Sequence, residues 1–145
     1  MADNKIQFNI QRIYIKDVSF ESPMSPKVFT DMSTAPKIGF NFESTITKLS
    51  DESHELCLNF TVKAELENDI LYLLELKQCG VFSLIVDDEE IKKRFLNVHC
   101  AEIVYPYARE NISSIIQKGG FPPLFISPVD FHTIYQNELD KRKEN

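Results

Sequence analysis

The chain has 145 residues, of which 43% are hydrophobic and 26% are charged, so we expect one globular domain, 1–145, with a real core. Its formal net charge of −6 argues against nucleic acid as a partner, because neutralising phosphates requires a basic face. The N-terminus lacks the pattern of a signal peptide, and no stretch approaches the roughly 18 apolar residues of a membrane span. We therefore expect a soluble, cytoplasmic protein that does not insert into membranes.

Four segments alternate between apolar and polar residues and are predicted to be strands. They are 6–21, 37–47, 56–66 and 70–77, joined by links that contain turn formers. One face of the first segment is expected to carry Ile6, Phe8, Ile10, Tyr14, Val18 and Phe20. Ile13 and Ile15 are exceptions to this alternation. The fourth segment is apolar on both faces, which favours a strand that is covered on both sides.

The second half of the chain changes to helical spacing. The acidic run 87–90 suits the N-terminus of a helix, because negative charge is stabilised there. A further helix is predicted from Val104 to Lys118, ended by the Gly119-Gly120 pair. Pro106 is expected in the first turn of that helix, where a missing N–H group costs little.

A last helix is predicted near the C-terminus. Ser127 is expected as its N-cap, with Pro128 and Asp130 in its first turn, and residues 140–145 are expected to fray. The first half of the chain is therefore predicted to form about four antiparallel strands with short links, and the second half to form helices.

The three cysteines are Cys57, Cys79 and Cys100. They are odd in number, far apart in the sequence and form no CxxC motif. This pattern predicts neither a disulfide framework nor a zinc site, and it favours a reducing compartment.

Residues with catalytic chemistry are few and poorly placed. His99 is adjacent to Cys100, but neighbouring residues on a helix point in different directions, so neither activates the other. The chain has four glycines and no phosphate-binding loop, so no cofactor, metal site or catalytic residue is predicted. A binding protein is therefore favoured. The alternative from another class is a small α+β enzyme or ligand-binding domain that uses His99 and Glu102.

Three blocks of the sequence resemble the SecB family of bacterial protein-export chaperones. They are FNIQRIYIKDVSFESP at 8–23, LELKQCGVFSL at 74–84 and VYPYARENISSIIQKGGFPPLFISPVDF at 104–131. The resemblance runs through nearly the whole chain in the right order. The chain departs from the family in having no tryptophan and a short tail of mixed charge.

The resemblance implies a fold, an assembly and a function. The fold is α+β, a sheet of four antiparallel strands with helices packed on one face, and four such subunits form a homotetramer, a dimer of dimers. The function is that of a holdase, which binds unfolded precursor proteins without ATP and delivers them to the motor SecA. A variant of this hypothesis is a SecB-like chaperone that is dedicated to a toxin–antitoxin partner.

The resemblance also assigns residues to surfaces. Docking of SecA is expected at Asp17, Glu21, Leu73 and Glu75. Client binding is expected between an aromatic-rich strand and the last helix, at Ile38, Phe40, Phe42, Phe131, Ile134 and Tyr135. The oligomer interface is expected at Leu74, Tyr107, Ala108 and Ile112, because the fourth strand and the helix 104–118 have apolar area on two sides.

Overall fold

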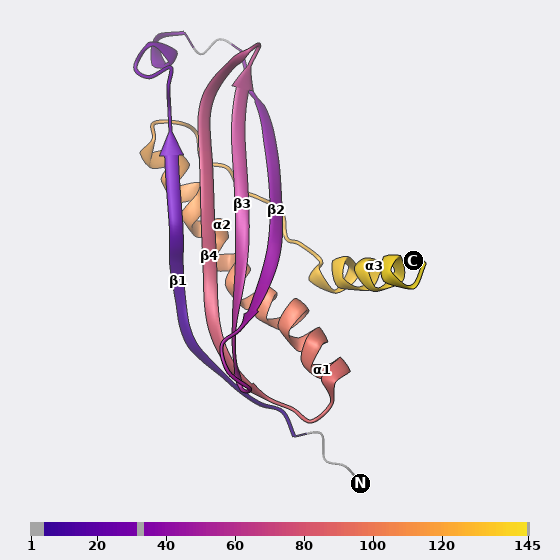
Figure 1. Cartoon of the computed structure of the whole chain (residues 1–145). Coiled ribbons are helices and arrows are strands. Elements are labelled where there is room, and N and C mark those ends of the chain that lie inside the picture. The colour runs from indigo at the N-terminus through magenta and orange to yellow at the C-terminus, as the bar shows by residue number, and fades with distance from the viewer. Residues whose placement is uncertain (1–4, 32–33, 145) are drawn as a thin grey trace.

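The computed structural model describes residues 5–31 and 34–144, and the side chain of Glu144 is not described. Four long strands form one antiparallel sheet in the order β1-β4-β3-β2. Their bounds are Gln7–Glu21 for β1, Lys37–Lys48 for β2, Ser53–Leu66 for β3 and Asp69–Ile85 for β4. A short 3-10 helix, η1, spans Lys27–Thr30 between β1 and β2. Figure 1 shows the helices on one side of the sheet, so the predicted α+β class is confirmed.

The alternation of β3 explains how the sheet acquires two different faces. Its apolar positions point to the helices and are almost fully buried, and they are Leu56, Leu58, Phe60, Val62 and Ala64. The intervening positions carry polar side chains and point to the opposite face, which we call the outer face.

Two register shifts in β1 correct the predicted faces of that strand. The shifts lie between Ile10 and Arg12 and between Ile15 and Asp17. Each extra residue moves the following side chains to the other face of the sheet. As a result, Ile13 and Ile15 point to the helix side, whereas Tyr14 lies on the outer face opposite Cys79. Ile13 and Ile15, which break the predicted alternation, therefore point to the same side of the sheet as the apolar residues before and after the two bulges.

The fourth strand is longer than predicted. It continues to Ile85 and pairs along most of its length with β3 on one side and β1 on the other. Among its buried residues is a polar one, Gln78, which is only 2% exposed. Glu75 and Lys77 are exposed on the outer face, so the subunit itself does not cover this part of β4 on both faces, and coverage by a neighbouring subunit stays a prediction.

A nearly continuous helical segment follows β4 and corrects the prediction of separate helices. It contains α1 (Glu89–Arg94), a π-helical turn, η2 (Phe95–His99), and α2 (Cys100–Lys118). The carboxylate of Asp88 accepts hydrogen bonds from the backbone N–H groups of Glu90 and Ile91, which caps α1 as the acidic run predicted. Pro106 lies inside α2 and not in a first turn, because the helix begins far upstream of it.

The end of α2 comes at Gly119 and Gly120, as predicted. Gly120 has a φ of +92°, a conformation that favours glycine. A Cβ on Gly119 would overlap the ring of Phe20 on β1, so the lack of a side chain lets the helix end approach the sheet.

The last helix, α3, spans Phe131–Glu144 and lies beyond β2 in Figure 1. Asp130 caps it, since its carboxylate accepts hydrogen bonds from the backbone N–H and the hydroxyl of Thr133. The predicted cap at Ser127 was therefore wrong by three residues. The helix continues through residues 140–144, so the expected frayed tail is helical as far as it is described.

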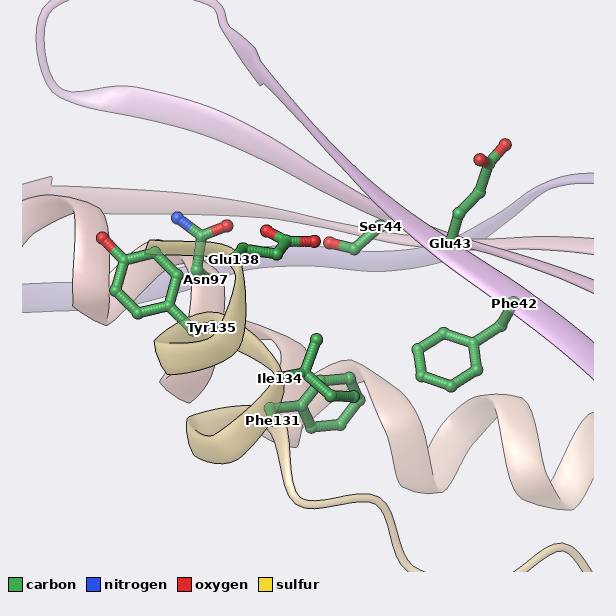
Figure 2. Close-up of a pocket in the computed structure, with 8 residues that line it drawn as sticks. All are labelled: Phe42, Glu43, Ser44, Asn97, Phe131, Ile134, Tyr135 and Glu138. Carbon is green, nitrogen blue, oxygen red and sulfur yellow. The ribbon is translucent and has the colours of Figure 1, made fainter. Parts of the chain in front are cut away.

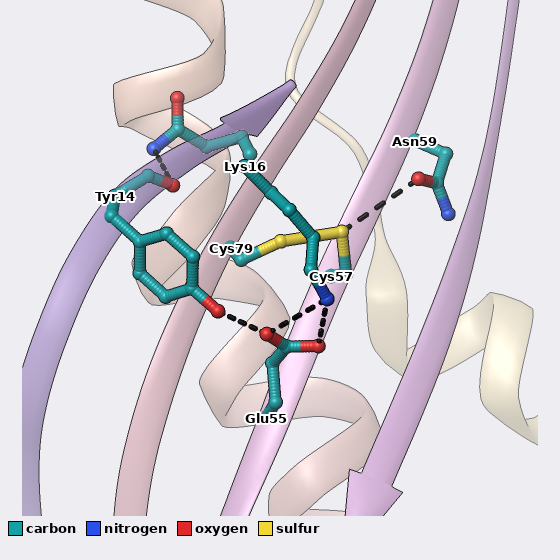
Figure 3. The surroundings of a disulfide bond; sticks show 7 residues. Tyr14, Lys16, Glu55, Cys57, Asn59 and Cys79 are labelled. Atoms are coloured by element: carbon teal, nitrogen blue, oxygen red, sulfur yellow. Dashed lines mark hydrogen bonds and ion pairs between the residues drawn. A yellow bond between two sulfur atoms is a disulfide. The ribbon is translucent and has the colours of Figure 1, made fainter.

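The structure also corrects the expectation about cysteines. Cys57 of β3 lies directly opposite Cys79 of β4, with their Cα atoms 4.2 Å apart, and the two form a disulfide (Figure 3). Cys100 is the buried free cysteine. The two cysteines are 22 residues apart in the sequence, and the register of the β3–β4 hairpin brings them into contact. The sequence pattern alone did not indicate this contact.

Candidate functional site

A groove of about 400 Å³ lies between β2, η2 and α3 (Figure 2). The strand contributes Phe42, Glu43 and Ser44, and the π turn contributes Asn97. The helix α3 contributes Phe131, Ile134, Tyr135 and Glu138. The groove thus has aromatic and aliphatic side chains along one part and polar groups at its margins.

Aromatic contacts fix the walls of the groove. The ring of Phe42 stacks on that of Phe60 at 5.6 Å and meets the ring of Phe131 edge-on at 6.0 Å. Phe131 also meets Tyr105 of α2 at 5.6 Å. The hydroxyl of Tyr105 donates a hydrogen bond to the backbone carbonyl of Ser127, which ties the linker before α3 to α2. The first turn of α3 is therefore anchored to both the sheet and α2.

The structure brings together four of the six residues predicted for client binding. Phe42, Phe131, Ile134 and Tyr135 line the groove. Ile38 and Phe40 point to the same side of β2, and they are 38% and 39% exposed, but they lie outside the groove lining. Whether any of the six binds a client remains a prediction.

Sequence reasoning missed four lining residues. Glu43 and Ser44 follow Phe42 on β2, and Glu138 lies one turn beyond Ile134 on α3, so their positions could have been inferred from helix and strand spacing. Asn97 gave no signal in the sequence, because it reaches the groove from the π turn η2.

The outer face collects the four residues predicted for docking of SecA. Glu21 pairs with Leu73, and Asp17 pairs with Lys77, so both acids share a face with Leu73 and Glu75. Asp17, Glu21 and Glu75 are exposed and Leu73 is half-buried. The period of two residues along each strand thus places these side chains together, with Lys77 as a positive charge among them.

A charged cluster lies on the same outer face, next to the disulfide (Figure 3). The carboxylate of Glu55 accepts a hydrogen bond from the hydroxyl of Tyr14, and the Nζ atom of Lys16 lies 2.9 Å from its Oε1. Burial raises the pKa of Tyr14 to about 12, and its hydrogen bond to Glu55 acts in the same direction. Burial also opposes ionisation of Glu55, but the hydrogen bonds from Tyr14 and Lys16 outweigh it and lower the pKa of the carboxyl.

The residues predicted for the oligomer interface divide into two groups. Leu74, Ala108 and Ile112 are fully buried in the core of the subunit, and Tyr107 is 52% exposed on α2. Of the four, Tyr107 is therefore the one that can contact another molecule. Apolar area is also exposed on the helix side of the edge strand β1, at Ile10, Ile15 and Val18.

The alternative site at His99 and Glu102 is an exposed pair. The Nδ1 atom of His99 lies 3.9 Å from Oε2 of Glu102, and both side chains are more than half exposed. Burial raises the pKa of the neighbouring Cys100 thiol to about 12, which disfavours the thiolate that a nucleophile requires. Across residues 5–31 and 34–144, no three His, Cys, Asp or Glu side chains form a group that could hold a metal ion.

These features are typical of a binding protein: an α+β subunit with an apolar groove on one side of its sheet and a polar outer face on the other. Within the described part of the chain, none of the helices combines the length and the apolar character that crossing a membrane requires.

Comparison with known proteins identifies the family. Residues 1–142 match the family model described as preprotein translocase subunit SecB. The chain is 38% identical over 138 residues to the protein-export protein SecB of Methylococcus capsulatus, covering 95% of this chain and 88% of that protein. It is 39% identical over 141 residues to the protein-export protein SecB of Marinobacter nauticus, covering 97% and 85%.

A solved structure shares the fold. The SecB-like chaperone Rv1957 of Mycobacterium tuberculosis, in complex with a ChAD peptide from the HigA1 antitoxin, superposes with a TM-score of 0.70 at 13% identity. The match covers 84% of this chain and 90% of that one. The chain belongs to the SecB family, and it is a protein-export chaperone and not an enzyme.

Proposed function

We propose that this chain is a single-domain, cytoplasmic holdase, which binds unfolded precursor proteins without ATP and delivers them to SecA. The observation that carries the proposal is the groove between β2 and α3, which presents aromatic and aliphatic side chains beside an open strand edge. Membership of the SecB family supports preproteins as the substrate class.

The groove suits clients of unrelated sequence. Burial of apolar surface is non-directional and contributes about 25 cal/mol per Å², so it does not require matched hydrogen bonds to particular side chains. The strand β2 pairs with β3 on one side, and its other edge lies at the border of the sheet. An extended client could add its backbone hydrogen bonds there while its apolar side chains enter the groove.

The outer face is proposed to dock SecA. Glu21 lies opposite Leu73 on it, Glu75 lies two residues further along β4, and Asp17 lies opposite Lys77. An acidic surface of this kind steers association with a basic partner. Because this face and the groove lie on different sides of the sheet, a client and SecA could be bound at the same time.

Assembly into a homotetramer, a dimer of dimers, is proposed from exposed apolar area. Ile10, Ile15 and Val18 lie along β1 at one border of the sheet, and Tyr107 and Phe125 lie on the outward side of α2, where Phe125 is 79% exposed. Exposed apolar side chains at two places favour two kinds of subunit contact. Four linked grooves would hold one client at several points and raise its overall affinity.

The second candidate function is that of a chaperone dedicated to one partner, such as an antitoxin. The mycobacterial relative is in complex with an antitoxin peptide, but at 13% identity that likeness shows the fold alone. The curated relatives at 38% and 39% identity are named protein-export proteins, which favours export.

The function is tested by binding and by aggregation. Excess protein, without nucleotide, should suppress aggregation of several unrelated denatured proteins, whereas a dedicated chaperone would protect one partner only. Phe42→Ala and Tyr135→Ala should each weaken binding of an unfolded precursor by roughly tenfold, because each removes an aromatic wall of the groove. Leu49→Ala removes a side chain that is 55% exposed, outside both the groove and the proposed subunit contacts, and serves as the control. Unchanged affinity in both groove variants would place the client site elsewhere.

A further inference from the structure

We propose that Arg94 is a positioning residue that holds α3 closed over the groove and thereby limits the rate at which clients enter. This inference rests on the proposed role of the groove in client binding. Arg94 is the last residue of α1, directly before the π turn η2, and its side chain reaches across to α3.

Arg94 contacts two residues of α3 at once. Its Nη1 atom lies 3.2 Å from Nδ1 of His132, to which it donates a hydrogen bond when that nitrogen carries no proton. Its guanidinium carbon lies 5.3 Å from the centre of the Tyr135 ring, a cation–π distance. His132 and Tyr135 are three residues apart and therefore lie on neighbouring positions of one helix face. A planar guanidinium is suited to serve both, because it donates in its plane and stacks with its face.

The same tyrosine forms a wall of the groove. Tyr135 lines the groove together with Phe131, and the two side chains are only 6% and 4% exposed. A client segment therefore cannot cover the faces of these rings unless α3 shifts away from the sheet. Arg94 stabilises the closed arrangement, in which α3 lies against the sheet. The open arrangement, with α3 shifted away, is the one that admits a client segment.

The attachment of α3 makes such a shift possible. The helix follows a linker, residues 121–130, that has no helix or strand, and its tertiary contacts with other elements gather on η2. Phe131 fixes the first turn through Phe42 and Tyr105. The next turn is held by burial of Tyr135 and Leu139 against the core, to which Arg94 adds its contacts with His132 and Tyr135. Loss of Arg94 should therefore loosen α3 beyond Phe131 and leave the sheet and α2 unchanged.

The size of the effect follows from the contacts removed. One half-buried cation–π contact and one hydrogen bond at the surface together shift an opening equilibrium by roughly five- to tenfold. If the open state is the one that binds, the apparent association rate rises by the same factor while opening is rare.

The experiment measures opening and client entry separately. Hydrogen exchange of the backbone amides of α3 is followed without client in the wild type, Arg94→Ala, Arg94→Lys and Lys93→Ala. Lys93 precedes Arg94 on α1, and within the described residues its side chain has no hydrogen bond or ion pair, so Lys93→Ala is the matched loss of charge. We expect exchange in α3 to rise roughly five- to tenfold in Arg94→Ala, to rise less in Arg94→Lys, and to stay at the wild-type rate in Lys93→Ala.

Client entry is then measured by stopped flow with a fluorescently labelled, chemically unfolded export precursor. Association with Arg94→Ala should be roughly five- to tenfold faster than with the wild type, at an unchanged melting temperature. Unchanged exchange of α3 would overturn the role of Arg94 whatever the client does. Faster exchange with unchanged association would overturn control of entry, provided that Phe42→Ala weakens binding of the same precursor. If Phe42→Ala has no effect either, the proposed client site fails, and the exchange data still decide whether Arg94 holds α3.

Discussion

Gln78 of β4 donates a hydrogen bond from its Nε2 atom to the backbone carbonyl of Tyr14 on β1, at 3.1 Å. Its Oε1 atom accepts a second hydrogen bond from Asn111 of α2, at 2.6 Å. This buried side chain therefore joins the bulged edge strand, the central strand and the long helix. Tyr14 lies just before the second register shift of β1, where the regular ladder is disturbed.

Gln78→Leu should lower the free energy of unfolding by about 1–3 kcal/mol, because it leaves the Tyr14 carbonyl and the Asn111 amide without their partner. Urea unfolding followed by circular dichroism measures the change. Gln117→Leu, the same substitution at an exposed position of α2, is expected to be neutral within about 0.5 kcal/mol. Equal stability of the two variants would show that the Gln78 hydrogen bonds contribute nothing net.

Charge reversal tests the outer face. Glu21→Lys combined with Glu75→Lys should weaken SecA binding on the order of tenfold, mainly by slowing association, and added salt should reduce the difference. The control is Asp51→Lys with Glu67→Lys, which changes the net charge equally at exposed turn positions. Calorimetry or biolayer interferometry with purified SecA gives the affinity. Loss of client binding in the first variant but not in the control would mean that the fold had been damaged.

The strand pattern explains how much of the fold the sequence could predict. The clean alternation of β3 predicted its buried face, because no bulge interrupts it before Ala64. In β1, nothing marks Gln11 or Lys16 as an extra residue, so the predicted faces were inverted between the two shifts, and the second shift restores the predicted face for Val18 and Phe20. Pro106 suggested that a helix begins there, but α2 begins at Cys100 and continues directly from the π turn η2.

The pairing of the two cysteines also depends on one extra residue in a strand, which the sequence does not reveal. A two-residue turn at Glu67 and Asn68 would place Cys57 opposite Gln78. The extra residue on β4 after Ile70 moves Cys79 into that position instead. The groove was easier to predict, since aromatic residues on the second strand and the last helix marked its walls. The contribution of Asn97 depended on a π turn that has no sequence signature.

Thiol counting tests the pairing of Cys57 with Cys79. Because reducing compartments keep such pairs as thiols, the measurement uses purified protein without reductant. The denatured chain should show one reactive thiol, that of Cys100, and three after reduction. Reduction should lower the free energy of unfolding by about 3 kcal/mol, as expected for a closed loop of this size. Cys57→Ser should be insensitive to reductant, and three thiols before reduction would exclude the bond.

His54 predicts a loss of stability in acid. It is 5% exposed, and its Nδ1 atom has no hydrogen-bond partner among the residues that the structure describes. Burial lowers the pKa of His54, and the positive charges of Lys92 and Lys48 lower it further, whereas Glu89 opposes them. The unfolded chain therefore takes up a proton near pH 6.5, and the folded chain only at lower pH, so the free energy of unfolding falls as the pH drops below about 6.5.

The measurement compares urea unfolding from about pH 7.5 to about pH 5.5 in the wild type and in His54→Phe. His54→Phe should show a smaller decrease in stability than the wild type, because the titrating group is gone. Parallel slopes in the two proteins would mean that His54 titrates equally in the folded and unfolded chains.

The edge strand β1 tests the assembly. Val18 is 43% exposed on the helix side, whereas its neighbour Ser19 points to the outer face opposite Glu75. If β1 lies in a subunit contact, Val18→Asp should lower the mass measured by light scattering and keep the circular dichroism of the folded subunit, because it buries a charge only in the assembly. Ser19→Asp adds the same charge on the other face and should keep the wild-type mass. Leu74→Asp places a charge in the core of the subunit, where Leu74 is fully buried, and should unfold it. A wild-type mass for Val18→Asp would exclude this strand from the interface and leave the outward side of α2, with Tyr107, as the remaining candidate.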